Sequence, residues 1–121
     1  MEALGLPKNS DEEKATRTEA IQSASKYAME IPLRTARVSF KAFEVCEAMI
    51  EIGNPNSVTD AGVGALAIRT AVLGACYNVR VNAGGITDKA FTEKLMNEAA
   101  ELEQLTDAKD AELRAKVLSK L

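Results

Sequence analysis

Apolar residues recur every three or four positions along most of the chain, a spacing that places them on one face of an α-helix. No stretch alternates apolar and polar residues between turn residues, as a strand would. Short turns separate the helical stretches, which favours antiparallel neighbours. The pattern therefore predicts an all-α protein, an antiparallel helical bundle of about four main helices. The first apolar stripe consists of Ala20, Ala24, Tyr27, Ala28 and Ile31.

The first predicted helix covers about Asp11 to Ile31. Ser10 is a suitable N-cap, and Glu13 follows three residues later, the spacing of a capping box. Acidic side chains in the first turn also interact favourably with the helix dipole. Pro32 lacks an N–H and clashes with the preceding turn, so we expect it to end or kink this helix.

The second predicted helix runs from about Leu33 to Ile52, and Gly53 suits its C-cap. Its expected buried face consists of Leu33, Ala36, Phe40, Phe43 and Ile50. The third helix reaches to about Asn82 and begins at one of three capping candidates, Ser57, Thr59 and Asp60. The residues that follow are small or apolar all round. We therefore expect this helix to be buried on every side, at the centre of the bundle or at a subunit interface.

The fourth predicted helix follows Gly84-Gly85 and is capped by Thr87 or Asp88. A second capping pattern at Thr106-Asp107 favours a break there, and the weakly amphipathic segment beyond it is helical by propensity. The helix's apolar stripe consists of Phe91, Leu95, Ala99 and Leu102.

The segment Met1 to Pro7 has the pattern of the last turn of a helix, followed by a Gly cap and a Pro stop. A helix end without a helix body predicts residues missing upstream. The alternative is a frayed N-terminal tail.

The composition excludes several classes of function. With 121 residues the chain is of single-domain length, and its net charge of −3 offers no basic surface for nucleic acid. The absence of histidine excludes His-ligated metal sites and catalytic triads within this chain. Any chemistry must therefore use Asp, Glu, Lys, Arg, Asn and backbone groups.

Three features predict a cytoplasmic, soluble protein without a membrane partner. Cys46 and Cys76 lie within apolar helical patterns, too few cysteines for a small secreted scaffold, so we expect reduced thiols. The N-terminus shows no signal-peptide pattern. The longest weakly charged stretch, Ala61 to Val79, is interrupted by Arg69 and is typical of a core helix rather than a membrane span.

Three polar segments are candidates for chemistry. Gly53 to Asp60 gathers two amides, two hydroxyls and a carboxylate beside a helix N-terminus, which indicates an anion or amide recognition site or an ordinary capped turn. Asn78 and Asn82 share one helix face near Arg80. These residues are either the rim of a binding site or simply the polar end of a helix that reaches solvent. Lys8 in the N-terminal loop suits carboxylate or phosphate binding, or surface solubility.

Several short strings lie at these same loops in a fixed order. The ordered set resembles the cyclodeaminase domain of formiminotransferase-cyclodeaminase and its stand-alone bacterial relative, methenyltetrahydrofolate cyclohydrolase, from about Leu4 to at least Phe91. The strings are Leu6-Pro7-Lys8-Asn9, Glu12-Glu13-Lys14, Ala20-Ile21-Gln22, Ile31-Pro32-Leu33, Gly53-Asn54-Pro55-Asn56, Asp60-Ala61-Gly62-Val63 and Asn78-Val79-Arg80-Val81-Asn82.

The resemblance implies an all-helical, homodimer-forming enzyme that acts on a one-carbon tetrahydrofolate derivative and needs no metal or tightly bound cofactor. The cyclodeaminase closes formimino-tetrahydrofolate to the methenyl form with loss of ammonia, and the cyclohydrolase opens the methenyl form to formyl-tetrahydrofolate. The sequence leaves open which reaction applies.

The resemblance also implies roles for six residues. Asp60 acts as the acid/base or orients the site, and Asn54, Asn56 and Asn82 contact the pterin or the reacting amide. Lys8 and Arg80 bind the carboxylates of the glutamate tail.

The chain departs from the family pattern in one respect. Family members carry an upstream half with a Pro-Gly-Gly-Gly-Ser-type loop, whereas the sole glycine pair here is Gly84-Gly85. We therefore expect residues 1–121 to form a single helical domain, the C-terminal part of a larger cyclodeaminase-type domain, with the upstream half missing or supplied by a partner. The alternative is a non-catalytic helical oligomerisation or interaction module that uses its apolar third helix.

Overall fold

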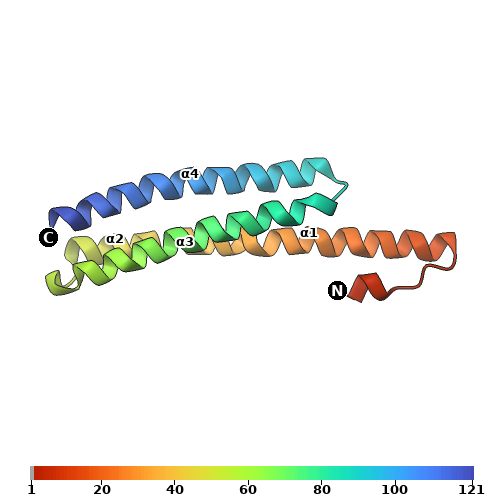
Figure 1. Ribbon diagram of the computed structural model, residues 1–121, viewed down its shortest axis with the longest axis horizontal. Helices are drawn as coiled ribbons and strands as arrows, with labels where there is room; N and C mark the ends of the chain where they lie inside the picture. Colours follow the sequence, from red (N-terminus) through yellow and green to blue (C-terminus); the bar gives the residue numbers. More distant parts are fainter. Residues whose placement is uncertain (1) are drawn as a thin grey trace.

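The computed structural model describes residues 2–121, which form three long helical rods (Figure 1). The first rod comprises α1 (Asp11–Lys41) and α2 (Phe43–Ile52), the second is α3 (Val58–Asn82) and the third is α4 (Lys89–Ser119). Short 3-10 turns precede α1 (η1, Glu2–Gly5), join α2 to α3 (η2, Pro55–Ser57) and follow α3 (η3, Ala83–Gly85). The predicted all-α class is confirmed, but three rods replace the expected four main helices.

The N-terminal segment doubles back along the first rod. η1 corresponds to the helix turn predicted before Pro7, and Met1 lies outside the described residues. The Arg17 guanidinium donates a hydrogen bond of 3.3 Å to the Leu4 carbonyl, which ties η1 to α1. α1 itself begins as predicted, because the Ser10 and Glu13 side chains form a reciprocal capping box.

The expected boundary at Pro32 is wrong, because α1 continues through Pro32 to Lys41. A proline inside a helix leaves the carbonyl four residues earlier without its usual N–H donor. That carbonyl belongs to Ala28, and the side-chain amide of Asn82 on α3 donates to it at 2.9 Å. Tertiary packing thus replaces the hydrogen bond that proline removes, so the helix need not end there.

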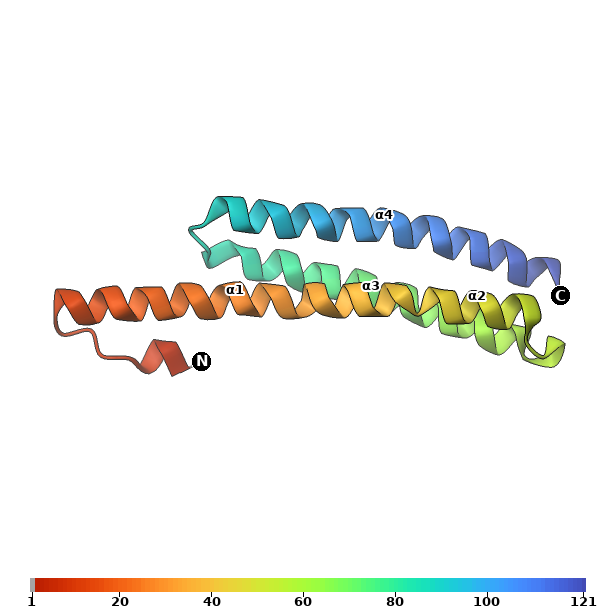
Figure 2. The ribbon, with the colours of Figure 1, turned by 180° about the vertical axis from the view of Figure 1, so that it is seen from behind.

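The first rod is interrupted at Ala42 instead. Ala42 keeps helical dihedrals and its N–H bonds the Ser39 carbonyl at 3.0 Å, a tightened turn that hardly deflects the rod (Figure 2). The rod therefore runs the length of the molecule, about 60 Å at 1.5 Å per residue.

Two apolar clusters lie along the bundle. Phe40 and Ile68 pack against both, and the rings of Phe40 and Phe43 meet edge to face at 5.7 Å. The larger residues of the first cluster are Met29, Leu33, Val72, Val79, Ile86 and Leu95. The second contains Phe43, Ile50, Val58, Ala65 and Leu113.

The expectation that α3 is buried on every side is wrong for this chain alone. α3 packs against α1–α2 and α4, but Val63, Tyr77 and Val81 are 65%, 67% and 73% exposed. The segment Pro55–Gly85 is long and apolar enough to cross a membrane, with a mean hydropathy of 1.3 in a window that is 28% buried. Arg69 in its middle pairs with Asp107 on α4 at 3.0 Å.

The turn between α3 and α4 is closed by side chains of α1. The Gln22 amide donates to the Gly85 carbonyl at 2.9 Å and accepts from the Thr87 N–H at 2.9 Å. Lys26 pairs with Asp88, the N-cap of α4, at 2.7 Å. These bonds set the position of α4 relative to the first rod.

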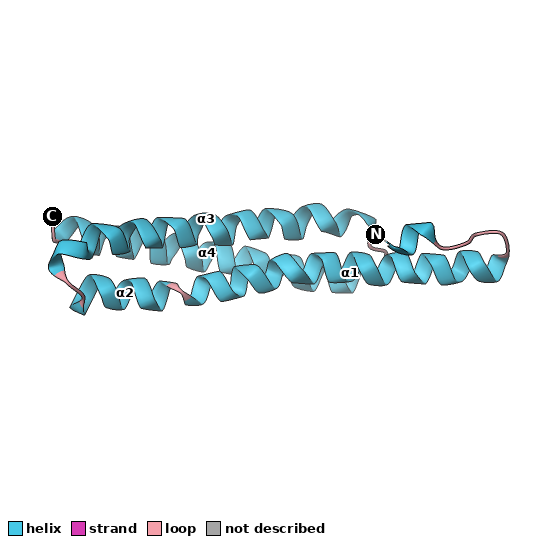
Figure 3. Cartoon of the chain, turned by 90° about the horizontal axis from the view of Figure 1, so that it is seen from below, coloured by secondary structure: helices cyan, strands magenta, loops and turns pink. Residues whose placement is uncertain are grey.

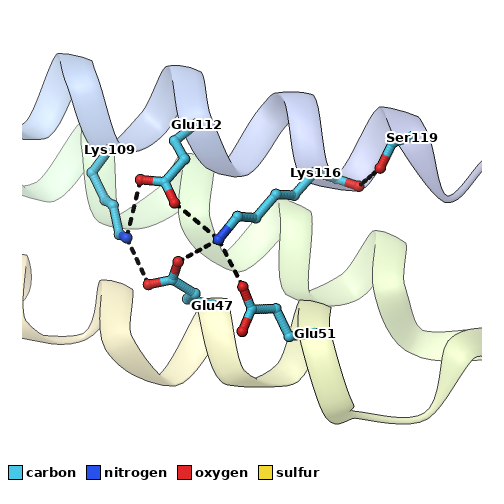
Figure 4. Close-up of polar contacts among 6 residues, drawn as sticks. All are labelled: Glu47, Glu51, Lys109, Glu112, Lys116 and Ser119. Atoms are coloured by element: carbon cyan, nitrogen blue, oxygen red, sulfur yellow. Dashed lines mark hydrogen bonds and ion pairs between the residues drawn. The ribbon is translucent and has the colours of Figure 1, made fainter.

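α4 continues through the expected break at Thr106-Asp107, because Thr106 is fully buried and Asp107 pairs with Arg69. Its C-terminal half is held to α2 by five charged side chains (Figure 4). They are Glu47, Glu51, Lys109, Glu112 and Lys116, with N···O distances from 2.5 to 3.2 Å.

Asn82→Ala should lower the free energy of unfolding by about 1–2 kcal/mol, because it leaves the Ala28 carbonyl without a donor. In a Pro32→Ala background the new N–H at position 32 satisfies that carbonyl, so the same change should have little effect. Urea unfolding of the four chains in this cycle measures the coupling. Asn78→Ala is the control, since Asn78 bonds the Gly74 carbonyl within its own helix. An equal loss in both backgrounds would contradict this account of Pro32.

The hydrogen bonds from Lys109 and Lys116 lower the pKa of Glu47 from 4.5 to about 2. Because the folded state favours the charged carboxylate, its contribution to stability is complete above about pH 4.5 and is lost as the pH falls towards 2. Glu47→Gln should therefore flatten the fall in unfolding free energy over this range. Urea titrations at a series of pH values measure it, with Glu101→Gln, an exposed α4 residue without an ion pair in residues 2–121, as control. A slope unchanged by Glu47→Gln would refute the assignment.

Candidate functional site

The turn between α2 and α3 carries three of the predicted site residues. Gly53 ends α2, and a side chain there would place its Cβ 2.3 Å from the Met49 carbonyl oxygen, so the turn requires glycine. The Asn54 side chain accepts a hydrogen bond of 3.0 Å from the Asn56 N–H and thereby caps η2. The expected capped turn is therefore present, with the Asn54 oxygen committed to it.

Asn56 and Asp60 are exposed at this end of the bundle. Asp60 lies in the first turn of α3. Within residues 2–121 neither side chain forms a hydrogen bond or ion pair with another side chain. They are the predicted site groups at this turn that can meet a ligand without giving up a contact.

The other end of α3 carries Arg80 and Asn82, which both have partners inside the chain. Arg80 binds Glu103 on α4 through two hydrogen bonds of 2.5 and 2.6 Å, which raise the pKa of the guanidinium. Asn82 donates to Ala28. The guanidinium keeps further N–H donors, and the Asn82 amide keeps its oxygen as an acceptor.

Lys8 is exposed and lies in the loop between η1 and α1. Figure 2 shows this loop at one end of the first rod. Asp60 and Asn82 are at opposite ends of α3, about 33 Å apart at 1.5 Å per residue. The six predicted residues therefore occupy three separate places in a single chain. The structure brings together Asn54, Asn56 and Asp60, and separately Arg80 and Asn82.

A groove of about 450 Å³ lies between α1 and α3 beside Asn82. Its polar lining includes Asn78, which the sequence analysis named as a candidate. It also includes Thr35 and Thr70, which the sequence analysis did not identify. Thr35 and Thr70 bond the carbonyls of Ile31 and Leu66, each within its own helix. A single threonine on a helix looks the same in a sequence whether it lines a groove or lies on ordinary surface, so the sequence alone could not identify these two residues.

A second groove of about 310 Å³, almost entirely apolar, lies between α3 and α4 close to Asp60. A Cβ at Gly62 would lie 3.1 Å from a Val117 methyl, so the two helices approach closely there. Thr59 and Arg114 are the polar residues of its lining. The groove is thus a small apolar surface, and Asp60 is not among the residues that line it.

Other chemistry is sparse in the described part of the chain. Both cysteines are free thiols, and burial raises the pKa of each, which makes them poor nucleophiles at neutral pH. Cys76 is fully buried and donates weakly to the Ala99 carbonyl at 3.6 Å. Residues 2–121 contain no group of three Cys, Asp or Glu side chains placed to hold a metal ion.

Comparisons with known proteins bear on this arrangement. A methenyltetrahydrofolate cyclohydrolase from Methylorubrum extorquens is 45% identical over 98 residues, which are 81% of this chain and 47% of that protein. A formimidoyltransferase-cyclodeaminase from Rattus norvegicus is 34% identical over 102 residues, 84% of this chain and 19% of that protein. The chain thus spans about half the length of the first relative and about a fifth of the second.

A family model described as Formiminotransferase-cyclodeaminase matches residues 1–101. The matched range includes all six predicted site residues and excludes the C-terminal half of α4 that the charged cluster holds. A match over most of the chain confirms the resemblance drawn from the short polar strings. The chain therefore belongs to the formiminotransferase-cyclodeaminase family.

Proposed function

We propose that this chain acts on a one-carbon tetrahydrofolate, as a methenyltetrahydrofolate cyclohydrolase. The observation that carries the proposal is the free carboxylate of Asp60, which stands beside Asn56 at the start of α3 inside the family match. The cyclohydrolase name of the Methylorubrum extorquens relative supports this reaction. A tetrahydrofolate derivative is then the substrate, and no tightly bound cofactor is required.

Formimidoyltetrahydrofolate cyclodeaminase activity is the second candidate. The description of the family model and the name of the rat relative favour it. Both reactions pass between an open one-carbon tetrahydrofolate and the cyclic methenyl form. They therefore need the same pterin contacts and differ in the group that leaves, ammonia or the ring nitrogen.

The hydrolysis needs little from the protein beyond placed polar groups. The methenyl carbon is part of an amidinium and is already electrophilic, so water can add to it once a base accepts a proton. The new carbon–oxygen bond gives a tetrahedral adduct. One carbon–nitrogen bond then breaks, its electron pair stays on nitrogen, and that nitrogen takes up a proton. The adduct hydroxyl loses its own proton to solvent as the formyl carbonyl forms, which yields formyl-tetrahydrofolate.

In this proposal the Asp60 carboxylate accepts the proton of the water and returns it to the departing nitrogen. Asn56 and Asn54 orient the pterin or the reacting amide through their free amide donors. Lys8 binds a carboxylate of the glutamate tail. Arg80 contributes through the donors that Glu103 leaves free, and Asn82 through its oxygen.

We also propose a cytoplasmic location for the protein. Two free cysteines and no disulfide within residues 2–121 are what a reducing compartment leads one to expect.

Methenyl-tetrahydrofolate absorbance should decay faster with purified chain than without it, and Asp60→Asn should lower that protein-dependent rate at least tenfold. General acid–base catalysis typically contributes about 100- to 10,000-fold, so the loss of its carboxylate should be measurable. Asp11→Asn is the matched control, because Asp11 is an exposed aspartate in the first turn of another helix. A rise in absorbance with formimino-tetrahydrofolate, with ammonia release, would identify the cyclodeaminase instead.

Two results would refute the proposal. Wild-type decay no faster than the spontaneous rate would show that residues 1–121 do not suffice for the activity. Equal rates for the wild type and Asp60→Asn would show that Asp60 is not the acid/base, even though the chain is active.

A further inference from the structure

The apolar groove between α3 and α4 is open to solvent. Three of the large apolar residues that line it are exposed, Val63 by 65%, Leu66 by 47% and Leu118 by 70%. The groove lies at the end of the bundle where α3 begins and α4 ends, and Figure 3 shows the C-terminus at that end. A contiguous exposed apolar surface of this kind is typical of a binding site.

The two walls of the groove differ in their relation to the family match. The α3 wall, from Thr59 to Leu66, lies within residues 1–101, which the family model matches. The α4 wall, from Leu113 to Leu118, lies beyond them. The complete groove therefore depends on a part of this chain that the family match does not include.

Among the described residues that line the groove, Arg114 alone is charged. Its Nε donates a hydrogen bond of 2.9 Å to an oxygen of Asp110 on the same helix. The terminal nitrogens of the guanidinium carry four further N–H donors, and none of them bonds a group within residues 2–121. The Arg114 side chain is 59% exposed, so these donors are open to a ligand in the groove.

The carboxylate that holds Arg114 is itself buried. The Asp110 side chain is only 3% exposed, and its bonded oxygen also lies 3.5 Å from the Arg69 guanidinium. The other Asp110 oxygen has no hydrogen-bond partner. A buried ion pair contributes little net stability, because removing the charges from water offsets their attraction. The clear structural consequence of burying Asp110 is therefore that it fixes the guanidinium of Arg114 at the edge of the groove.

The groove has a charged inner end and an apolar outer end. α3 and α4 are antiparallel, and Gly62 faces Val117. Arg114 precedes Val117 by three residues, so it is level with a point about three residues after Gly62. From there the groove extends back to Thr59, about 9 Å at 1.5 Å per residue. Asp60 follows Thr59 and disfavours an anion at this outer end, whereas Arg114 attracts one at the inner end.

We propose that this groove binds an unbranched aliphatic carboxylate of about eight carbons, with its carboxylate on Arg114 and its alkyl chain directed toward Thr59. With C–C bonds of about 1.5 Å, a zigzag chain of about eight carbons spans about 9 Å, the length of the groove. The planar guanidinium can bind a carboxylate through two parallel hydrogen bonds. The rest of the lining is apolar apart from Thr59, which suits an alkyl chain that needs no hydrogen bonds. This ligand lies outside the proposed folate reaction, and its binding does not depend on that reaction.

Isothermal titration calorimetry with octanoate tests the site on the purified chain without any folate. Octanoate should bind saturably, with a Kd of about 1 mM or lower. Octanol has the same chain without the carboxylate and should bind at least about fivefold more weakly, because the charge-assisted hydrogen bonds to Arg114 are lost. Absence of saturable octanoate binding would overturn the proposal, and it is the result expected if a helix of another chain covers the groove instead. Equal affinities for octanoate and octanol would also overturn it.

Two variants place the ligand in this groove. Arg114→Gln should weaken octanoate binding at least about fivefold and leave octanol binding unchanged, whereas Arg34→Gln, at an exposed arginine of α1 without an ion pair in residues 2–121, should change neither. Octanoate binding unchanged by Arg114→Gln would refute the role of the guanidinium.

Val63→Glu places a carboxylate on the wall of the groove and should abolish octanoate binding. Val38→Glu is the matched control, because Val38 is 64% exposed on α1, away from the groove, and Val63 is 65% exposed. Both positions face solvent, so the helical fold should survive each change, and circular dichroism verifies this. Octanoate binding that survives Val63→Glu, or that both changes abolish equally, would place the ligand elsewhere and overturn the proposal.

Discussion

The hydrogen bond from Asn82 to the Ala28 carbonyl is the contact on which the rest of the architecture depends. Pro32 removes the N–H that this carbonyl would otherwise accept. A donor from α3 lets α1 continue for two further turns, and it also fixes the register of α3 against the first rod. Through that register the two polar ends of α3 take their positions, so a local defect of one helix determines where the candidate groups lie.

The C-terminal half of α4 follows a different principle from the rest of the bundle. Thr106 and Asp110 are buried between the two apolar clusters, and the Thr106 hydroxyl and one Asp110 oxygen have no hydrogen-bond partner. Such groups weaken the contact between helices. Arg69 and Arg114 neutralise Asp110, and the cluster around Lys116 then holds the next turns to α2. Ion pairs thus stabilise the part of α4 that lies beyond residue 101, where the family match ends.

Local signals predicted the starts of helices well and their interruptions poorly. The Ser10–Glu13 box and the Gly53 turn act over four residues, so the sequence alone identifies them. The continuation through Pro32 depends on an amide fifty positions away, which no local pattern contains. The ion pairs of the charged cluster escape local prediction for the same reason, because Glu47 and Lys116 meet only once α2 and α4 are in register.

The candidate site shows the same division between local identity and tertiary position. Polar strings on turns identified the residues and the family, since each turn needs its own amides and glycines. Their separation into three places follows from the shape, because a bundle of three thin rods, the first about 60 Å long and the others shorter, holds its polar turns far apart at its two ends. In such a shape, groups at opposite ends of one helix can share a ligand only if another surface brings them together. The exposed apolar residues Val38 and Val45 and the dispersed polar groups therefore follow from one constraint, because a bundle this thin covers only part of each helix.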